Sequence, residues 1–470
     1  MPRWLVILGI FVLLSGGKSA AQPAETKLDP NIYDNYLGTY ELSSGELLVI
    51  GRSQRVLYFY EPSTGLARGL DHAPSSTPAL KWFAGPSFQI FSPVQFEIEF
   101  IRKGGMIAGL VLLKPGVATQ TAKKVPFYRE EKVSFRSGDA ILSGTLLIPS
   151  TKGPHPAVVC VHGSGEQDRN GFGSIIRFVA DHFARHGIAT LIYDKRGVGG
   201  STGNWANQTL DDLATDALAG FRMLQNRSDI NRKQIGLWGS SQAGWIMPKM
   251  AAQTNEIAFI ISVSGAGAGI SVGDQVLYNL EVDLHNAGFS PDEIAEWKQA
   301  YRLLYKIVQT GEGTDTSQLE ELVRKLQQNP KLSDAIRVNW FLARSNPKID
   351  WKKRDQWFFL YDPNFDALPL WRQYTGPVLG IFGELDGLAP VSEVVPIFAK
   401  ILASRKNTDF TIAVFPKAHH ILMEMETDTP NDNELPRLKR YVPGYFDTMS
   451  EWLSRHVTIN IDNSQKTLKR

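Results

Sequence analysis

The sequence predicts an α/β fold: a doubly wound, mostly parallel sheet with a helical cap insertion, preceded by a small antiparallel β-domain. Residues 157–161 and 189–194 are apolar runs typical of buried strands, and residues 175–187 between them have the pattern of a helix closed by a glycine. Strands joined through a helix form a parallel crossover unit. By contrast, residues 33–126 alternate in short runs separated by glycine turns, as antiparallel strands do. A helical pattern after residue 263 predicts the insertion.

The first 21 residues have the pattern of a secretory signal peptide. A basic residue, Arg3, precedes an apolar stretch from Trp4 to Leu14, and small residues follow at positions 19–21. The apolar stretch is too short to cross a bilayer, which takes about 20 residues. We therefore expect signal peptide 1–21 to be removed and the chain to be exported, periplasmic or secreted, without stable membrane insertion. An uncleaved N-terminal anchor is the alternative.

The cysteine content implies that the exported chain is held together by its apolar core and not by disulfides. Its single cysteine, Cys160, lies in a predicted buried strand and has no partner for an internal disulfide. The formal net charge of +2 falls to zero once Arg3 and Lys18 leave with the signal segment, which contains no acidic residue. A neutral chain offers no basic stripe, so we expect no nucleic-acid partner. The sequence leaves the oligomeric state open.

Residues 28–126 are expected to form the small β-rich domain, a curled sheet or a barrel. Alternating runs such as residues 96–100 and glycine turns such as Gly104-Gly105 predict strands with one buried face. No cluster of His, Asp, Glu or Ser in this region suggests chemistry of its own. Packing or substrate recruitment is therefore the expected role.

The sheet is expected to begin with an antiparallel hairpin and to continue with parallel strands. Residues 132–143 alternate around Ser137-Gly138-Asp139, the pattern of a hairpin. Further along, residues 210–224 have the pattern of a helix with acidic residues in its first turn, where negative charge favours the helix dipole. Helices that alternate with strands predict a doubly wound sheet.

A candidate nucleophile follows the apolar run of residues 235–238. The sequence G-S-S-Q-A-G at 239–244 separates this run from a helix-like stretch, so Ser241 is expected on a tight strand-to-helix turn. Gly239 and Ala243 supply the small side chains that a strained turn requires, and a hydroxyl at such a turn projects from the sheet edge. The alternative is a strand that ends in an ordinary polar turn.

The helical insertion follows a predicted strand at residues 257–263. Ser290-Pro291-Asp292-Glu293 is a capping box with proline at the first helical position. After it, apolar residues recur at the spacing of one helix face, including Ile294, Trp297 and Tyr301. The helical pattern continues to about Lys353.

An acid and a histidine follow two later strands. The strand predicted at residues 377–382 leads into G-E-L-D, which ends at Asp386, and the strand at 410–415 leads into His419-His420. The chain order is therefore serine, acid, histidine, which is the order of the α/β-hydrolases and differs from that of chymotrypsin-type and subtilisin-type enzymes. Glu384 is the alternative acid.

Five motifs together resemble the α/β-hydrolase superfamily. They are H-G-S-G at 162–165, Y-D-K-R-G-V-G at 193–199, G-S-S-Q-A-G at 239–244, G-E-L-D at 383–386 and F-P-K-A-H-H at 415–420. The chain is most similar to bacterial exported serine esterases whose catalytic domains are dienelactone-hydrolase-like or acylaminoacyl-peptidase-like. The resemblance covers residues 130–456 approximately.

The resemblance implies a catalytic triad of Ser241 as nucleophile, Asp386 as orienting acid and His420 as base. Related families place a small or amide residue before the catalytic histidine, and His419 occupies that position here. We therefore choose His420 as the base and regard His419 as a packing residue, with the reverse assignment as the alternative.

The oxyanion hole is expected to combine two backbone N–H groups. One belongs to Gln242, the residue after the nucleophile, and the other to Ser164 in the H-G-S-G loop. Gly163 is the alternative for the second donor. His162 is expected to be structural, and Asp194 and Arg196 are expected to hold a turn.

The resemblance implies an α/β-hydrolase domain at 128–457 whose cap insertion, about 269–365, lies over the active site. The predicted function is hydrolysis of a carboxylic ester or thioester, a small-molecule substrate, through an acyl-enzyme. One alternative is a peptidase of the acylaminoacyl or dipeptidyl type, although residues 28–126 are too few for the propeller of such enzymes. The other is a non-catalytic binding protein on the same scaffold, whose expected sign, a lost triad residue, is absent.

No cofactor and no metal are expected. The glycine-rich run at residues 265–269 lacks the spacing of a dinucleotide-binding fingerprint. The acidic residues that follow His420 lack the histidine spacing of a zinc site, and we expect them to form a solvated loop.

Overall fold

The computed structural model describes residues 30–54, 56–72, 80–311, 313–333 and 362–459. The predicted signal peptide and residues 334–361 of the predicted insertion lie outside these ranges. Within them, no helix has the length and apolar character needed to cross a membrane.

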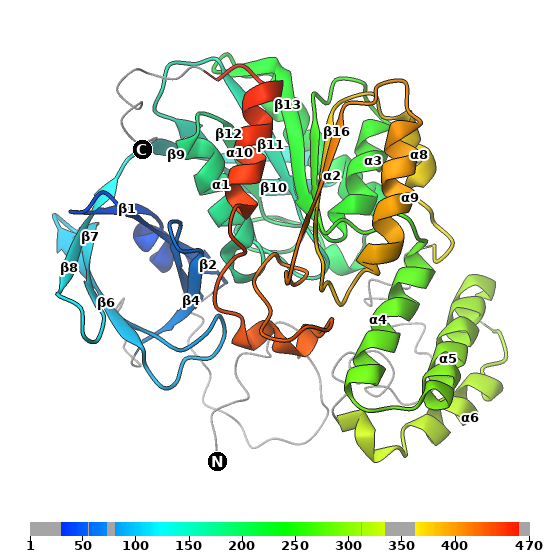
Figure 1. The fold of residues 1–470 in the computed structure, drawn as a ribbon. Coiled ribbons are helices and arrows are strands. Elements are labelled where there is room, and N and C mark those ends of the chain that lie inside the picture. Colours follow the sequence, from blue (N-terminus) through cyan, green and yellow to red (C-terminus); the bar gives the residue numbers. More distant parts are fainter. Residues whose placement is uncertain (1–29, 55, 73–79, 312, 334–361, 460–470) are drawn as a thin grey trace.

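The N-terminal part is an eight-stranded antiparallel barrel (Figure 1). It follows the short 3-10 helix η2 (Pro30–Tyr36), and β1 pairs with β8 to close it. The strands are β1 (Gly38–Leu42), β2 (Leu47–Ser53), β3 (Val56–Glu61), β4 (Leu66–Asp71), β5 (Lys81–Ala84), β6 (Phe96–Lys103), β7 (Met106–Leu113) and β8 (Gln120–Val125). Buried side chains such as Tyr40, Phe59 and Trp82 fill the interior, as expected for a barrel of this size.

The second part is an eight-stranded mixed sheet with strand order β16-β15-β14-β13-β11-β12-β10-β9. The strands from β11 to β16 are parallel, and β9 and β10 form an antiparallel hairpin at one edge. The bounds are β9 (Tyr128–Ser137), β10 (Ala140–Pro149), β11 (His155–Val161), β12 (Ala189–Tyr193), β13 (Ile230–Ser240), β14 (Ile260–Val263), β15 (Val378–Gly383) and β16 (Phe410–Phe415). The predicted fold class is confirmed.

Helices cover both faces of this sheet. One face packs on α1 (Ile175–Arg185) and α10 (Tyr445–His456). The other packs on α2 (Leu210–Gln225), α3 (Ala243–Ala251), α8 (Leu368–Gln373) and α9 (Val391–Ala403). Along β11, Val158 and Cys160 point to the first face, whereas Val159 and Val161 point to the second. A strand that is buried on both faces reads as a continuous apolar run, which is why the sequence pattern predicted it.

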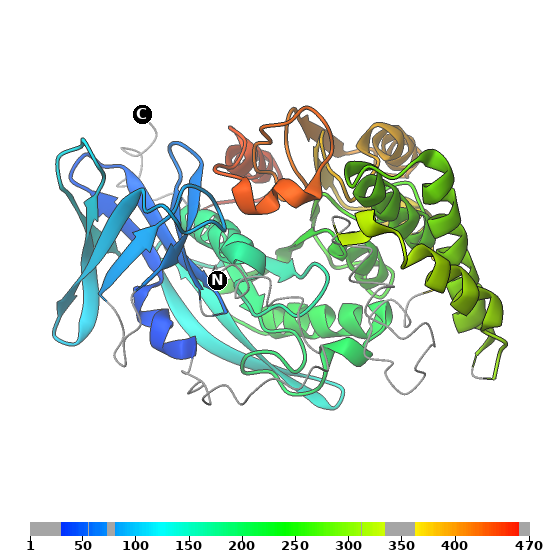
Figure 2. The ribbon, with the colours of Figure 1, turned by 90° about the horizontal axis from the view of Figure 1, so that it is seen from below.

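The helical insertion contains α4 (Val272–Asn286), α5 (Pro291–Thr310) and α6 (Ser317–Leu326), which share an apolar core around Leu284 and Trp297. The capping box at Ser290 starts α5 as predicted. Figures 1 and 2 show these helices and the barrel at opposite ends of the molecule, with the sheet between them. Gln275 Nε2 on α4 donates to the Leu388 carbonyl at 2.6 Å, so the insertion contacts the loop that follows β15.

The barrel packs directly against the second part. The Ala67 N–H on β4 donates to the Lys439 carbonyl at 3.0 Å, and the Tyr441 N–H donates to the Gly65 carbonyl at 2.9 Å. Apolar contact continues from Tyr60 on β3 to Phe178 on α1, with ring centroids 5.1 Å apart. The two parts are therefore joined by a buried interface and not only by the segment of chain between β8 and β9.

Candidate active site

Ser241 lies on a strained turn between β13 and α3. Its φ is +57°, a left-handed backbone conformation that residues other than glycine rarely adopt unless the surrounding structure constrains them. Three backbone hydrogen bonds supply the constraint. The Ser241 N–H donates to the Val263 carbonyl at 3.0 Å, and the Ser241 carbonyl accepts from the N–H groups of Gly244 and Ala266, both at 2.9 Å.

The small residues around Ser241 are required by close packing. A Cβ atom added at Gly239 would lie 2.5 Å from the Ala243 Cβ, and one added at Gly244 would lie 2.2 Å from the Ala266 carbonyl oxygen. Both distances are far shorter than an allowed contact, so side chains are excluded on each side of the serine. The local sequence pattern therefore has a steric cause.

The predicted acid and base form a buried pair. His420 Nδ1 lies 2.8 Å from Asp386 Oδ2, and the Leu388 N–H donates to Asp386 Oδ1 at 2.7 Å. Asp386 is 1% exposed and His420 is 8% exposed. Because an ionised carboxylate only accepts hydrogen bonds, Nδ1 carries the hydrogen and Nε2 is the nitrogen that can act as a base.

The neighbouring histidine has a different partner. His419 Nε2 lies 2.9 Å from Asp432 Oδ1, and the Ile421 N–H donates to His419 Nδ1 at 3.3 Å. Glu384, the alternative acid, accepts instead from the Lys417 N–H at 3.0 Å. The structure thus brings Asp386 together with His420, and it places His419 and Glu384 in other contacts.

The prediction of a solvated loop after His420 holds for Glu424, Glu426 and Asp428, which are exposed, but is wrong for the rest of the segment. Met423 and Met425 are buried against the core, and Met423 forms an isolated bridge with Tyr441. Asp432, at the start of the 3-10 helix η8 (Asp432–Arg437), is the partner of His419. The alternation of acidic and apolar residues reflects a segment with one buried side.

The H-G-S-G loop follows β11 and lies against the serine turn. A Cβ atom added at Gly163 would lie 3.4 Å from the Ser240 carbonyl oxygen and 3.5 Å from the Ser241 Cβ. Gln242, whose N–H is the other candidate donor, is 2% exposed at the start of α3. Both candidate donors, those of Ser164 and Gln242, therefore belong to segments that adjoin Ser241.

All these segments follow the carboxyl ends of parallel strands, namely β11, β13, β15 and β16, so they meet at one edge of the sheet. In an open parallel sheet this edge is where ligands bind. In the described parts of the chain no hydrogen bond joins Ser241 Oγ to His420. The pairing of nucleophile and base therefore stays a prediction.

Sequence reasoning missed Lys195, which is 3% exposed and packs against the backbone of the H-G-S-G loop. Its Nζ donates to the carbonyls of Gly163 and Gly165 at 2.6 and 2.9 Å. Lysine is almost always exposed, and no local pattern indicates its burial. The flanking residues hold the turn as expected: Asp194 pairs with Arg169, and Arg196 pairs with Asp216.

Metal ligation finds no support in the described ranges, where no group of three or more His, Cys, Asp or Glu is arranged to hold an ion.

A family model described as Hydrolase_4, Serine aminopeptidase, S33, matches residues 152–428, which is more than half of the chain. Esterase EstD of Thermotoga maritima is 31% identical over 156 residues, covering 32% of this chain and 36% of that protein. The quorum-quenching protein AidA of Acinetobacter baumannii is 30% identical over 132 residues, covering 28% of this chain and 42% of that protein. The chain thus spans less than half the length of these curated relatives.

Solved structures of similar architecture include Est1E of Butyrivibrio proteoclasticus with bound ferulic acid. It is 17% identical with a TM-score of 0.41, and the match covers 69% of this chain and 98% of that one. The α/β hydrolase GrgF of a Penicillium species is 20% identical with a TM-score of 0.41, covering 70% of this chain and 99% of that one.

Proposed function

Because the chain belongs to the Hydrolase_4 family (Serine aminopeptidase, S33), we propose that it is a serine hydrolase that cleaves carboxylic esters or thioesters through an acyl-enzyme. The family membership agrees with the α/β-hydrolase resemblance of the five motifs. The observation that carries the proposal is the His420–Asp386 pair, 2.8 Å apart, at the sheet edge that also bears the strained Ser241.

In the proposed reaction, His420 Nε2 takes the proton of Ser241 as Oγ attacks the substrate carbonyl. The N–H groups of Gln242 and Ser164 stabilise the oxyanion that forms. His420 then gives its proton to the departing alcohol or thiol, and the acyl-enzyme remains. A water molecule, deprotonated by His420, attacks this ester and releases the acid and the free Ser241 hydroxyl.

Asp386 supports both steps without changing its own protonation. Its carboxylate accepts from His420 Nδ1, which holds the tautomer with a free Nε2 and stabilises the imidazolium. The Leu388 N–H fixes the orientation of that carboxylate through its second oxygen.

Labelling with a fluorophosphonate, followed by a panel of substrates, tests the proposal. Wild-type protein should become labelled at Ser241 and should hydrolyse p-nitrophenyl esters or a thioester faster than an aminoacyl anilide. Preference for the anilide would favour peptidase activity, which is the activity that the family description names. A folded protein that neither becomes labelled nor turns over any of these substrates would indicate a binding protein.

We also propose export to the periplasm or beyond, on the basis of the sequence pattern of residues 1–21. N-terminal sequencing of the chain after expression in a Gram-negative host should show a start at about residue 22. An intact N-terminus in the membrane fraction would favour an anchor instead.

A further inference from the structure

A single buried ammonium group touches both segments of the proposed oxyanion hole. Lys195 follows β12, and its Nζ donates to the Gly163 carbonyl at 2.6 Å, to the Gly165 carbonyl at 2.9 Å and to Gln242 Oε1 at 3.5 Å. An ammonium has three N–H donors and no acceptor. Three oxygen atoms therefore match the donors of the charged form. The neutral amine keeps two N–H donors, which is enough for the two closer carbonyls of Gly163 and Gly165.

The contact with Gly163 has a direct geometric consequence for Ser164. The carbonyl of Gly163 and the N–H of Ser164 belong to one planar, trans peptide group, so the two point in opposite directions. Holding the carbonyl oxygen on Lys195 therefore aims the Ser164 N–H away from the lysine. The hydrogen bond also polarises the peptide, which makes its N–H a stronger donor.

The other two contacts limit movement on either side of that peptide. The Gly165 carbonyl lies just beyond Ser164, and Lys195 holds it as well. Gln242 carries the second candidate N–H, and its side-chain amide lies against the same Nζ atom. The lysine thus links the two segments whose N–H groups must converge on one oxygen.

We infer that Lys195 is a positioning residue that sets the relative orientation of the Ser164 and Gln242 N–H donors in the oxyanion hole. This inference rests on the proposed function, because it assumes that the two N–H groups bind a developing oxyanion. It assigns Lys195 no contact with the substrate.

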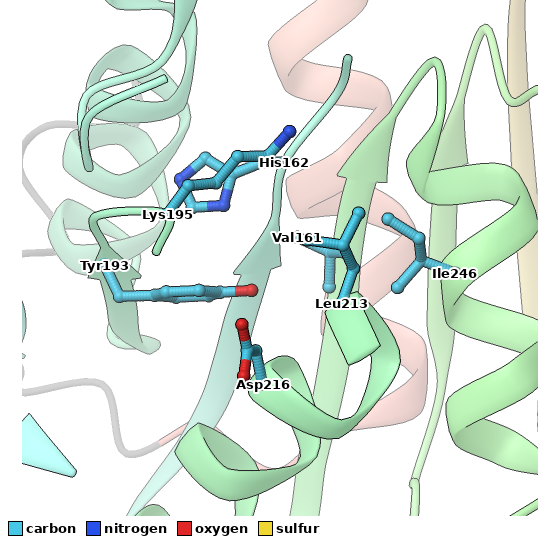
Figure 3. Close-up of a pocket in the computed structure, with 7 residues that line it drawn as sticks. All are labelled: Val161, His162, Tyr193, Lys195, Leu213, Asp216 and Ile246. Carbon is cyan, nitrogen blue, oxygen red and sulfur yellow. The ribbon is translucent and has the colours of Figure 1, made fainter. Parts of the chain in front are cut away.

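Among the described residues, the acids nearest to Lys195 are bound to other cations. Figure 3 shows the lysine beside His162 and Tyr193, around a small cavity that is also lined by Asp216. Asp216 is bound to Arg196 at 2.7 Å, and Asp194 is bound to Arg169 at 2.6 Å. In the described part of the chain, Lys195 Nζ has no hydrogen bond to a carboxylate.

Burial shifts the pKa values of Lys195 and its neighbours in the direction that favours their neutral forms. Burial lowers the pKa of His162 to about 3, with the Lys195 charge adding to the effect, and burial raises the pKa of Tyr193. Burial also lowers the pKa of Lys195 to about 7. A buried cation without an acidic partner is costly to keep. Its three contacts with the oxyanion-hole segments are the compensation that the structure offers.

Arg196 offers a matched control in the same turn. Its guanidinium is also largely buried and pairs with Asp216 and Asp139, but it makes no hydrogen bond to the H-G-S-G loop or to Gln242 in the described structure. Substitution of Arg196 should therefore disturb the turn without disturbing the oxyanion hole.

The test compares the wild-type chain with Lys195→Met, Lys195→Gln and Arg196→Met. For each, kcat and KM are measured with the best p-nitrophenyl ester, and the inhibition constant is measured with an aryl trifluoromethyl ketone. Serine adds to this ketone to give a hemiketal whose oxyanion occupies the hole, and the serine proton passes to His420. Thermal unfolding reports whether each variant is folded.

For Lys195→Met we expect kcat to fall by about 10- to 100-fold, somewhat less than for loss of a whole donor, with KM changed by less than about threefold. The inhibition constant should rise by the same factor as kcat falls. Lys195→Gln, which keeps two N–H donors without the charge, should lie between Lys195→Met and the wild type. Arg196→Met should unfold at a lower temperature but keep kcat and the inhibition constant.

A folded Lys195→Met with wild-type kcat, or one that loses kcat without weaker ketone binding, would overturn the inference. So would an equal kinetic loss in Arg196→Met. If neither Lys195 variant folds while Arg196→Met does, the lysine is structural and the inference is wrong. A wild-type protein that neither labels nor hydrolyses esters would instead refute the proposed function.

Discussion

At the scale of residues, two adjacent histidines are distinguished by their carboxylate partners. His420 pairs with Asp386, whereas His419 is 1% exposed and pairs with Asp432. A triad needs an imidazole with a carboxylate on one nitrogen and the serine on the other. Asp386 directly follows β15, a strand of the parallel sheet that also leads to Ser241, whereas Asp432 belongs to the 3-10 helix η8.

We predict that His420→Ala loses kcat/KM nearly as completely as removal of the nucleophile does, by roughly 10⁶-fold. His419→Ala should retain most of kcat/KM but be less stable by about 1–3 kcal/mol, because Asp432 then loses a buried partner. Steady-state kinetics and urea unfolding measure the two effects. If His419→Ala is the inactive variant, the histidine assignment is reversed.

Lys195 gives a pH dependence of stability whose sign can be worked out. Its pKa is about 7 in the folded protein, against 10.5 for the free side chain. Between these values the unfolded chain holds a proton that the folded chain has lost, so the free energy of unfolding rises with pH, by up to about 1.4 kcal/mol per unit. Below about pH 7, Lys195 is protonated in both the folded and the unfolded chain, so the folded protein bears the full free-energy cost of burying the charge.

The difference in unfolding free energy between wild type and Lys195→Met should therefore increase from pH 7 to pH 9. Urea unfolding at pH 7, 8 and 9 measures it. A difference that stays constant or shrinks as pH rises would show that Lys195 stays charged in this range.

At the scale of elements, the sequence predicts the helices and strands whose buried residues recur at a regular spacing along the chain. β11 is buried on both faces and was recognised as an apolar run, and α5 was recognised from its capping box. The sequence also predicts the serine turn, because close packing there requires small residues at Gly239 and Ala243, and these are visible in the local sequence.

The remaining parts depend on contacts between distant segments, which leave no local pattern. Lys195 is buried by the H-G-S-G loop about 30 residues earlier in the chain, and a lysine alone indicates exposure. The sequence around Asp432 predicts a solvated loop, because nothing near it in sequence indicates that it pairs with His419. The attachment of β4 and the preceding Gly65 to residues 439–441 likewise joins segments from opposite ends of the chain.

We predict that α5 and α6 select the substrate and take no part in bond cleavage. The variant keeps α4, whose Gln275 holds the loop beside Asp386, and replaces residues 288–361 with a short linker. Leu277 and Leu284 are changed to Gln, because they are buried in the core that α4 shares with α5 and α6 and would become exposed in the variant. Lost apolar contact, worth about 25 cal/mol per Å², should flatten the chain-length profile of p-nitrophenyl esters.

Fluorophosphonate should still label Ser241 in this variant, and Gln275→Ala in the full chain separates the role of α4 from that of α5 and α6. An unchanged chain-length profile would place the two helices away from the pocket. A folded variant that no longer becomes labelled would show that they contribute to catalysis.

At the scale of the whole molecule, the barrel reaches the segment that follows the H-G-S-G loop. Arg52 Nη1 on β2 donates to Asp168 Oδ2 at 2.8 Å, and the Gln54 N–H donates to the same oxygen at 3.2 Å. Asp168 is 6% exposed, and its burial raises its pKa while the Arg52 cation opposes that change. The barrel thereby helps to hold the segment that leads from the loop to α1.

We predict that Arg52→Met lowers the free energy of unfolding by about 3–5 kcal/mol, because it leaves Asp168 buried without its cation. The double variant Arg52→Met, Asp168→Asn should recover part of this loss. Lys81→Met is the control, because Lys81 of the same barrel pairs with Glu97 at the surface, where water screens the pair, so its loss should change the free energy of unfolding much less. Urea unfolding that shows equal losses for Arg52→Met and Lys81→Met would mean that the barrel does not depend on this contact.

The central claim is that Ser241 is the nucleophile of an acyl-enzyme reaction, and the hydrolysis rate of purified Ser241→Ala tests it most directly. The substrate is the p-nitrophenyl ester that the wild type hydrolyses fastest, and thermal unfolding shows whether the variant keeps the wild-type fold. We expect a loss of roughly 10⁶-fold in kcat with an unchanged unfolding temperature. A folded Ser241→Ala protein that hydrolyses the ester within tenfold of the wild-type rate would contradict the claim.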